Sequence, residues 1–188
     1  MIVQNGIRNV EIIGTRTEIE KRNLKVLNKV QIIVACCILL VVSCDSYKIF
    51  DEYKSVNGSW QAKNIVEFSF TFKDTIESYN VFINVRNNNN YQYNNLFLIG
   101  EIKFPNGKSI TDTLEYKMAK PTGELLGTGF SDVKENKLWY KERIVFDESG
   151  LYKIKLQHAM RENGNIDGLE SLNGITDIGL RIEKVIGY

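Results

Sequence analysis

Hydrophobic and polar residues alternate one by one over much of the chain that follows Cys44. In VEFSFTF, at 66–72, the apolar side chains fall on one face and the polar ones on the other. The same period of two returns at 79–85, 96–104, 152–160 and 178–182. Because successive side chains of an extended strand point to opposite faces, this pattern predicts half-buried antiparallel strands. We expect Phe68, Phe70 and Phe72 to form part of the core.

Turn signals separate the predicted strands at short intervals. PNGK, at 105–108, joins proline to Asn-Gly, a strong hairpin signal, and SITDTLEY follows it as a returning strand. After Cys44, no window of ten or more residues has the i, i+3, i+4, i+7 repeat of an amphipathic helix. The sequence therefore predicts an all-β fold, a two-sheet antiparallel sandwich with Greek-key or jelly-roll connections and eight or nine strands. We expect this domain at 57–188, behind a tether at 44–56.

The chain begins with a different pattern. Residues 30–42 are apolar except for Gln31, a run shorter than the roughly 20 residues that a membrane-spanning helix needs. A cluster of positive charges at 21–29 precedes this run. A basic segment, an apolar segment and a small residue before a cut are the parts of a secretory signal peptide. We therefore interpret residues 1–43 as a leader helix. Residues 1–28 exceed what a leader needs, so they represent an upstream over-extension or a long basic segment.

The leader ends in Val41-Val42-Ser43-Cys44, which is similar to the lipobox of bacterial lipoproteins. This similarity predicts cleavage between Ser43 and Cys44 and lipidation of the Cys44 thiol. Each buried methylene of an acyl chain contributes about 0.8 kcal/mol, so two or more chains hold a protein stably at a membrane. The alternatives are an ordinary leader or a core helix with a coincidental cysteine.

Charge and cysteine content exclude several classes of function. The net charge of +1 comprises 24 basic and 23 acidic groups. Six of the basic and three of the acidic groups precede Cys44. The rest of the chain is nearly neutral, with 18 basic and 20 acidic groups. Nucleic-acid binding needs a concentrated basic face instead. All three cysteines lie at 36–44 and His158 is the one histidine, so neither a disulfide framework nor a Cys/His zinc site is expected.

No residue pattern indicates a reaction. His158 continues the inward register of the predicted strand at 152–160, which favours a partly buried histidine whose hydrogen bonds are satisfied. The sequence has no G-x-S-x-G motif to supply a nucleophile. The glycines of 121–140 lack the spacing of a nucleotide-binding loop, and this segment is interpreted as one that switches or bulges between sheets. We expect no enzyme and no cofactor.

The polar stretch RNNNNYQYNN, at 86–95, joins two predicted strands. Asparagine tolerates left-handed turns, so a solvated loop is one interpretation. Loops on rigid sheets also carry binding residues, and tyrosine is favoured at interfaces. The residues of this candidate interaction loop are Asn87, Asn88, Asn89, Asn90, Tyr91 and Tyr93.

Two further hypotheses concern sugars. Asp74-Thr75-Ile76 and Asp112-Thr113-Leu114 look like the Asp-Thr-aliphatic signal for O-glycosylation in Bacteroidetes envelope proteins, with Thr75 and Thr113 as acceptors, although ordinary strand-edge text reads the same. An alternative function is a lipid-anchored carbohydrate-binding module. Its candidate stacking residues are the aromatics Trp60, Trp139, Tyr91 and Tyr93.

From Cys44 to Lys184 the chain resembles the gliding-motility lipoprotein GldH family of Bacteroidetes. The resemblance is carried by long segments in the same order: SCDSYKIFDEYKSVNGSW, YNVFINVRNNNNYQYNNLFLIGEIKFPNGKSITDTLEY, GTGFSDVKENKLWYKE, GLYKIKLQHAMRENG and GITDIGLRIEK. The departures are the long N-terminal extension and a longer acidic stretch at 167–173.

This resemblance implies a non-enzymatic envelope lipoprotein that is needed for surface gliding. It implies other gliding and type IX secretion envelope proteins as partners, and a membrane contact through acylated Cys44. Cys44 is the one residue carried over from the family, as its lipidation site. We expect the outer membrane as the location, with the periplasmic face favoured over the cell surface.

Overall fold

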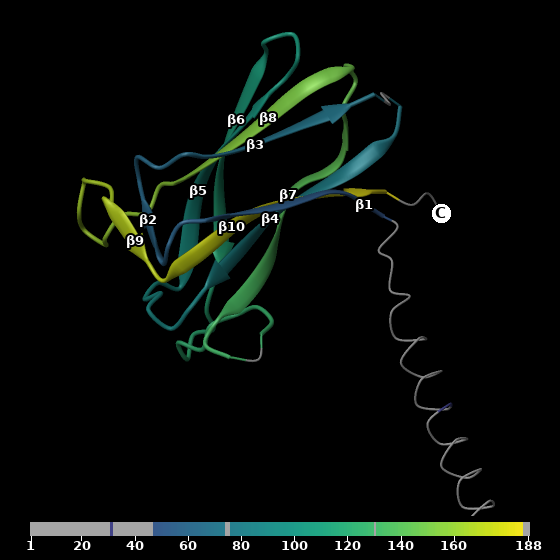
Figure 1. Ribbon diagram of the computed structural model, residues 1–188. Helices are drawn as coiled ribbons and strands as arrows, with labels where there is room; N and C mark the ends of the chain where they lie inside the picture. The colour runs from purple at the N-terminus through teal and green to yellow at the C-terminus, as the bar shows by residue number, and fades with distance from the viewer. Residues whose placement is uncertain (1–30, 32–46, 74–75, 130, 186–188) are drawn as a thin grey trace, which may run out of the picture. The chain divides into compact units, whose positions relative to one another are not determined.

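The computed structural model describes residues 31, 47–73, 76–129 and 131–185. The chain divides into two compact units, Met1–Ser46 and Tyr47–Tyr188. Nearly all described residues belong to the second unit, which is built from antiparallel strands (Figure 1). The predicted leader therefore lies almost wholly outside the described residues.

Ten strands make up the described part of the second unit. They are β1 (Lys48–Ser55), β2 (Ser59–Gln61), β3 (Val66–Phe72), β4 (Ser78–Asn87), β5 (Asn95–Lys103), β6 (Ser109–Lys117), β7 (Lys134–Val145), β8 (Gly150–His158), β9 (Ser171–Asn173) and β10 (Ile175–Lys184). Eight of them have seven or more residues, whereas β2 and β9 have three each. The predicted all-β sandwich is confirmed, with ten strands instead of the expected eight or nine.

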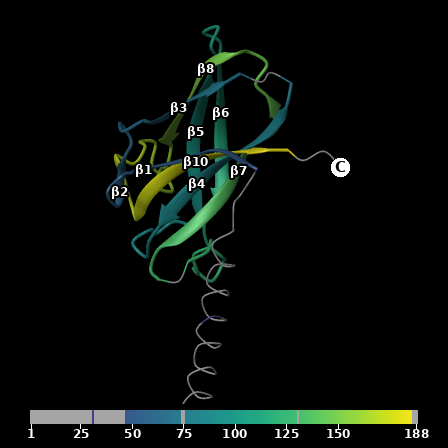
Figure 2. The same ribbon diagram turned by 45° about the vertical axis from the view of Figure 1, so that its right-hand side comes forward.

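The strands pair as one long ribbon that doubles back on itself. β1 pairs with β10, β2 with β9, β3 with β8, β4 with β7, and β5 with β6, all antiparallel. The ribbon then winds so that β10 also pairs with β4 and β8 with β5. The result is two four-stranded sheets, which we call sheet A (β1-β10-β4-β7) and sheet C (β3-β8-β5-β6), with β2-β9 as a short third sheet. Such winding of a double-stranded ribbon is the jelly-roll arrangement (Figure 2).

The tip of the ribbon is the hairpin that PNGK predicts. Lys103 of β5 lies opposite Ser109 of β6, and the Phe104 N–H donates to the Lys108 carbonyl at 2.8 Å. Gly107 has a φ of 89°, a left-handed value that glycine adopts without a steric penalty. The hairpin prediction is confirmed, and it fixes the register from which the ribbon extends.

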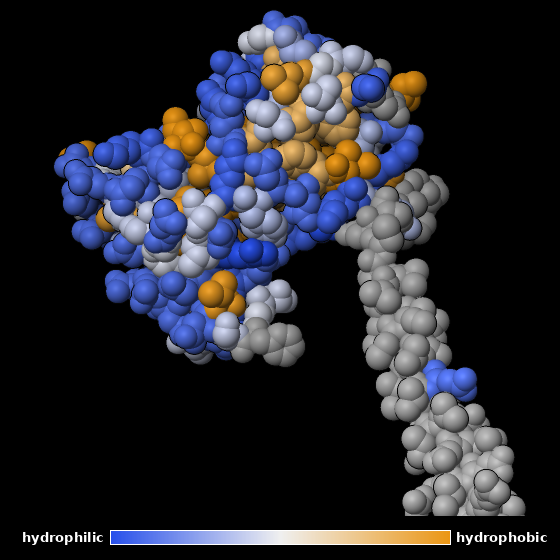
Figure 3. Space-filling view, in the orientation of Figure 1, coloured by the Kyte–Doolittle hydropathy of each residue, from blue (hydrophilic) through white to orange (hydrophobic). Residues whose placement is uncertain are grey.

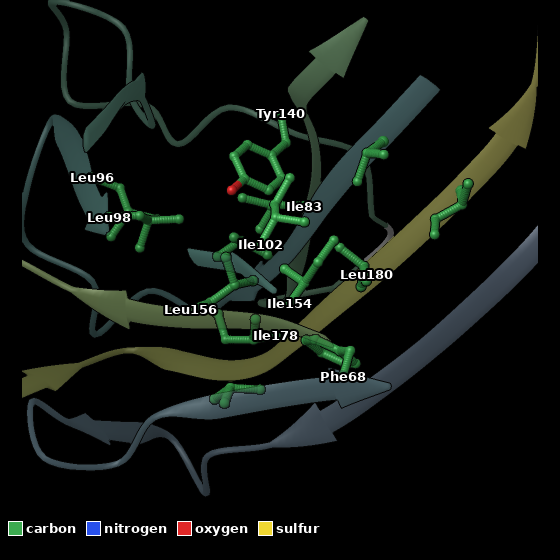
Figure 4. Packing of buried hydrophobic residues seen from close by; sticks show 14 of the residues in the cluster. Phe68, Ile83, Leu96, Leu98, Ile102, Tyr140, Ile154, Leu156, Ile178 and Leu180 are labelled. Atoms are coloured by element: carbon green, nitrogen blue, oxygen red, sulfur yellow. The ribbon is translucent and has the colours of Figure 1, made fainter. Parts of the chain in front are cut away.

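The inward faces of the two large sheets form the core (Figure 4). Phe68 of β3, Ile83 of β4 and Leu98 of β5 are fully buried there, as their alternation predicts. Phe72 stacks on Phe146 with ring centroids 4.4 Å apart, and Phe70 lies 6.0 Å from Tyr152. On the face that Figure 3 shows, most of the surface is hydrophilic and apolar colour gathers over β3. The aromatic residues therefore join the sheets rather than cover them.

The structure corrects the predicted tether at 44–56. Lys48–Ser55 form β1, which pairs with β10 along its length. β1 is an edge strand, and its acidic and basic side chains interrupt the apolar alternation. Charges of this kind are common on edge strands because they oppose pairing with other chains. The folded domain thus begins at β1 and not at residue 57.

The glycine-punctuated segment between β6 and β7 passes from one sheet to the other, as its sequence predicts. β6 lies at an edge of sheet C and β7 at an edge of sheet A. Before β7 the segment makes an isolated bridge between Thr128 and Glu135. Gly127 allows this bridge because a Cβ there would lie 2.6 Å from the Glu135 carbonyl oxygen, and its φ is 97°.

Replacing Phe68 by alanine tests the core. Phe68 is 0% exposed, so Phe68→Ala removes a buried ring and leaves a cavity, and we expect a loss of about 3–5 kcal/mol in the free energy of unfolding. Ile166→Ala is the matched control, since Ile166 is 88% exposed. Urea unfolding followed by tryptophan fluorescence measures both. Equal midpoints for the two variants would contradict the inward placement of Phe68.

Candidate functional site

A groove of about 1540 Å³ is hollowed into the outer face of sheet C. Its floor is formed by outward-facing residues of β5 and β6, namely Asn95, Phe97, Ile99, Thr113, Glu115 and Lys117. Three connecting segments wall it: 92–94 before β5, 119–121 after β6 and 159–163 after β8. All three lie at the same end of the sheet, because β5 runs antiparallel to both β6 and β8. The jelly-roll winding thus builds a concave surface from stretches far apart in sequence.

Part of the predicted interaction loop is structural. Asn87 belongs to β4 and is fully buried, where its Oδ1 accepts a hydrogen bond of 2.9 Å from the Asn136 Nδ2. Tyr91 is also buried, and its hydroxyl donates to the Asn95 carbonyl at 2.6 Å. A Cβ on Gly174 would lie 2.2 Å from the Tyr91 nitrogen, so the loop packs directly on that glycine. Asn87 and Tyr91 are therefore not available at the surface, which corrects the prediction for these two residues.

The remaining loop residues form a turn that leads into the groove. The Asn88 Oδ1 accepts from the Asn90 N–H at 3.0 Å, and the Asn89 Nδ2 donates to Asp132 at 3.3 Å. Asn89 and Asn90 are exposed, whereas Asn88 and Tyr93 are half-buried. Tyr93 lines the groove. The prediction of a contact surface is thus narrowed to Asn88–Asn90 and Tyr93.

Thr113 is exposed on the floor of the groove, in the middle of β6. Its neighbour Asp112 faces the other way and accepts hydrogen bonds from Lys141 and Tyr140 of β7, at 3.0 and 3.3 Å. Asp112 therefore has a structural role that ties β6 to β7. Thr75, Ser43 and Cys44 lie outside the described residues, and glycosylation, cleavage and lipidation stay predictions.

The aromatic residues proposed to stack on sugar are divided between core and surface. Trp60 is fully buried, and its Nε1 donates to the Asn64 carbonyl at 2.8 Å. Trp139 is 54% exposed on the outer face of sheet A, where it packs on Phe82 with ring centroids 4.4 Å apart. Only Tyr93, of these candidates, lines the groove.

A polar cluster on the outer face of sheet A was not predicted from the sequence. We define the Tyr53 cluster as Tyr53, Asn84, Arg86 and Glu135, from β1, β4 and β7. The Tyr53 hydroxyl accepts from the Asn84 Nδ2 at 2.7 Å and donates to the Glu135 carboxylate at 2.9 Å. The Arg86 Nε donates to the same carboxylate at 2.7 Å, and its guanidinium carbon lies 4.1 Å from the Tyr53 ring centroid.

The Tyr53 cluster depends on a glycine of the strand between β1 and β4. Tyr53 lies opposite Gly179 of β10, and a Cβ on Gly179 would come within 2.7 Å of the Tyr53 ring. Without that atom the ring lies flat over β10 and reaches β4 and β7. Partial burial, together with the adjacent Glu135 carboxylate, raises the pKa of Tyr53 to about 12, so the phenol stays protonated at neutral pH. The Tyr53 cluster therefore links β1, β4 and β7 across sheet A, and it does not supply a catalytic base.

No local signal in the sequence reveals the Tyr53 cluster. Its three strands are far apart in sequence, since Tyr53 is 31 residues from Asn84 and 82 residues from Glu135, and each member occupies an outward position of its strand. The one hint is Gly179 within an otherwise regular strand, because an isolated glycine there often marks a close approach of another group.

His158 is more deeply buried than predicted, at 3% exposure, and its hydrogen bonds are not satisfied. Among the described residues, neither ring nitrogen has a hydrogen-bond partner. The ring packs edge-on against Trp60 at 5.5 Å. Burial lowers the pKa of His158, and the nearby Trp60 backbone offsets this only in part. His158 therefore acts as a neutral core residue.

Two other kinds of site were searched in the described residues. No group of three or more His, Cys, Asp or Glu side chains there could hold a metal ion. Within the same residues, no helix has the length and apolar character needed to cross a membrane.

The buried histidine makes stability depend on pH. The folded pKa lies below the unfolded value of about 6.5, so the unfolded chain binds more protons and stability falls as pH drops below that value. We expect His158→Leu to remove this contribution, of up to about 1.4 kcal/mol per pH unit. The melting temperatures of wild type and His158→Leu at pH 7.5 and 5.0 measure this contribution. The carboxylates also affect stability at low pH, but they are the same in both proteins. Equal losses on acidification would contradict the neutral, buried state of His158.

The contribution of the Tyr53 cluster to stability can be tested by removing the Tyr53 hydroxyl. Tyr53→Phe leaves the Asn84 amide and the Glu135 carboxylate without their shared partner, and we expect a loss of about 1–2 kcal/mol in unfolding free energy. Tyr47→Phe is the control, because Tyr47 is half exposed and outside the cluster. Chemical unfolding compares the two. If both variants unfold at the wild-type midpoint, the Tyr53 cluster does not stabilise sheet A.

Comparison with known proteins relates the whole domain to one family. A family model described as GldH lipoprotein matches residues 48–182. A gliding motility lipoprotein GldH homolog of Christiangramia forsetii is 58% identical over 147 residues, which are 78% of this chain and 90% of that protein. The gliding motility lipoprotein GldH of Flavobacterium johnsoniae is 51% identical over 146 residues, covering 78% and 91%.

Similarity to solved structures is much lower. The VP2 subviral particle of infectious bursal disease virus has a TM-score of 0.36 and 17% identity, over 77% of this chain and 34% of that one. No function follows from a likeness of this size. The match of the family model to all the long strands, together with the two closely related proteins, decides the assignment: the chain belongs to the GldH lipoprotein family.

Proposed function

We propose that this protein is a lipid-anchored component of the cell envelope that supports gliding motility. The observation that carries the proposal is identity above 50% to two proteins named gliding motility lipoproteins, over most of this chain and nearly all of theirs. A shared role is therefore supported, and not only a shared fold.

The proposed anchor is Cys44, acylated after cleavage behind Ser43. β1 begins at Lys48, so three residues separate the anchor from the first strand. An extended chain of that length spans about 14 Å from one Cα to the other. The domain would thus be held close to the bilayer surface. The outer membrane, with the periplasmic face favoured, is the location that the family resemblance supports.

The proposed role is that of a non-enzymatic scaffold that works beside the gliding and type IX secretion machinery. The surroundings of four titratable side chains support this non-enzymatic role. His158 is neutral and enclosed, and Tyr53, Arg86 and Glu135 are bound to one another. None of them is both activated and open to a substrate, as acid–base or nucleophilic catalysis requires.

Carbohydrate binding is a second candidate function, and the groove on sheet C favours it. The groove has two apolar residues, Phe97 and Ile99, on an otherwise polar floor, and amide side chains on its walls, and a site for a polyhydroxylated ligand combines apolar and polar surface in this way. The two functions are compatible, since an anchored scaffold can also hold an envelope glycan.

Replacement of the anchor residue tests the first function. We expect Cys44→Ala to release the protein into the soluble fraction and to abolish colony spreading on agar, because the acyl chains that hold it at the membrane are absent. Cys36→Ala and Cys37→Ala are the matched controls and should leave both properties intact. Fractionation, mass spectrometry of the mature N-terminus and spreading assays provide the readouts. Normal spreading by a soluble Cys44→Ala protein would contradict the proposal.

A further inference from the structure

We infer that the end of the sandwich at which β1 begins lies against the lipid bilayer, with its exposed apolar side chains among the lipid headgroups. We call this end the anchor end. The inference rests on the lipid anchor proposed at Cys44. It adds the surface of the domain that faces the membrane and the residues that touch lipid.

Strand topology defines the anchor end. In sheet A, β1 and β4 begin there and β7 and β10 end there, as their antiparallel pairing requires. Five residues connect β3 to β4 and four connect β7 to β8, so in sheet C β3 ends and β8 begins at the same end. The arrow of β3 points toward it, on the right of Figure 1. The groove on sheet C is walled by the segment that follows β8, and it therefore lies toward the opposite end.

Five large apolar side chains of the anchor end are exposed. Tyr47 and Ile49, at the start of β1, are each 50% exposed, and Ile76, which precedes β4, is 86% exposed. Val145 at the end of β7 is 40% exposed, and Leu151 at the start of β8 is 51% exposed. The five other exposed large apolar residues of the described chain are divided between the strand faces and the opposite end.

Four of these side chains belong to the edge of one sheet. The Lys184 N–H donates to the Tyr47 carbonyl at 2.9 Å, which places the end of β10 beside the start of β1. On the other side of β10, β4 begins at Ser78, opposite Val145 of β7. Neighbouring strands are about 4.8 Å apart, so about 14 Å separate β1 from β7. Ile76 lies two residues before Ser78. The exposed side chains are thus neighbours at this end, although they are far apart in sequence.

The proposed anchor keeps this end at the membrane. Lys48 follows Cys44 by four residues, so their Cα atoms are at most about 14 Å apart. The strands are longer, since the ten residues of β10 extend for about 33 Å. Whatever the tilt of the domain, the start of β1 therefore stays near the bilayer. Lipid is the apolar phase that every anchored molecule keeps within reach of these side chains, and contact there directs the groove away from the bilayer.

The chemistry of the anchor end suits the boundary between lipid and water. Tyrosine is enriched at this boundary, and aliphatic side chains enter the zone between headgroups and acyl chains. The charged residues of this end have both signs, and two of its lysines are paired within the protein, Lys48 with Asp51 at 3.5 Å and Lys184 with Glu77 at 2.8 Å. We therefore expect the contact to depend on apolar burial and little on anionic lipid or salt.

The test uses the full mature protein, in the native envelope and, after purification, in lipid vesicles. Ile76 or Ile166 is replaced by a photoreactive diazirine residue, and mass spectrometry after irradiation identifies adducts with lipid or protein. Ile166 is the matched control, because it is 88% exposed and lies between β8 and β9, at the opposite end. The vesicles contain phosphatidylcholine, with or without phosphatidylglycerol, at low and high salt.

A second pair of variants tests the contribution of the neighbouring side chains. Tyr47→Ser/Val145→Ser is made in the protein with the photoreactive residue at position 76. Ile65→Ser/Val133→Ser is the matched control, since Ile65 and Val133 are 50% and 38% exposed and lie at the opposite end. Melting curves show whether each variant is folded.

We expect at least about five times more lipid adduct at position 76 than at position 166, because the anchor end touches the bilayer. Tyr47→Ser/Val145→Ser should lower the yield at position 76 at least about twofold, since apolar contact area is lost, and the control pair should leave it unchanged. Phosphatidylglycerol and high salt should change it less than about twofold.

Several results would overturn the inference. Equal lipid adducts at the two positions would show that no end is preferred, and adducts of position 76 with protein would show a protein contact instead. A yield that vanishes at high salt would show an electrostatic contact. The mass of the mature N-terminus reports acylation of Cys44 separately. An acylated protein with little adduct at position 76 refutes the contact and leaves the anchor intact, whereas an unmodified Cys44 refutes the anchor while the adducts still decide the contact.

Discussion

Burial of apolar surface between two sheets is the constraint on which the rest of this structure depends. The ribbon of paired strands can wind into a sandwich only because each long strand turns one face inward. Rings from different strands meet there, such as Phe72 of β3 and Phe146, which follows β7. With both inward faces buried, the outward faces of sheets A and C are free to differ from each other.

The two outward faces do differ. On sheet A, the Tyr53 hydroxyl and the Arg86 guanidinium share the Glu135 carboxylate, and Gly179 provides the space that the Tyr53 ring needs. The Asn84 Oδ1 of this cluster is buried without a hydrogen-bond partner among the described residues. On sheet C, the end near β5 and β6 is hollowed, and several amides and cations around it have no partner within the described residues. Polar groups that bond to one another stiffen a surface, whereas uncommitted groups in a concavity are what a ligand can use.

The short distance in sequence between Cys44 and β1 links these faces to the proposed anchor. β1 pairs with β10 at an edge of sheet A, so the proposed anchor lies only a few residues in sequence from a paired strand of the domain.

The sequence alone determined the fold class, the PNGK hairpin and the inward residues of the regular strands, because strand periodicity and turn chemistry are local properties. It missed β1, whose edge position permits charges that hide the alternation, and it gave Asn87 and Tyr91 a surface role although both are buried. The Tyr53 cluster, the unsatisfied His158 and the groove were decided only by tertiary structure. Their residues come together because the ribbon winds back on itself, and contacts between residues so far apart in sequence leave no pattern in the chain.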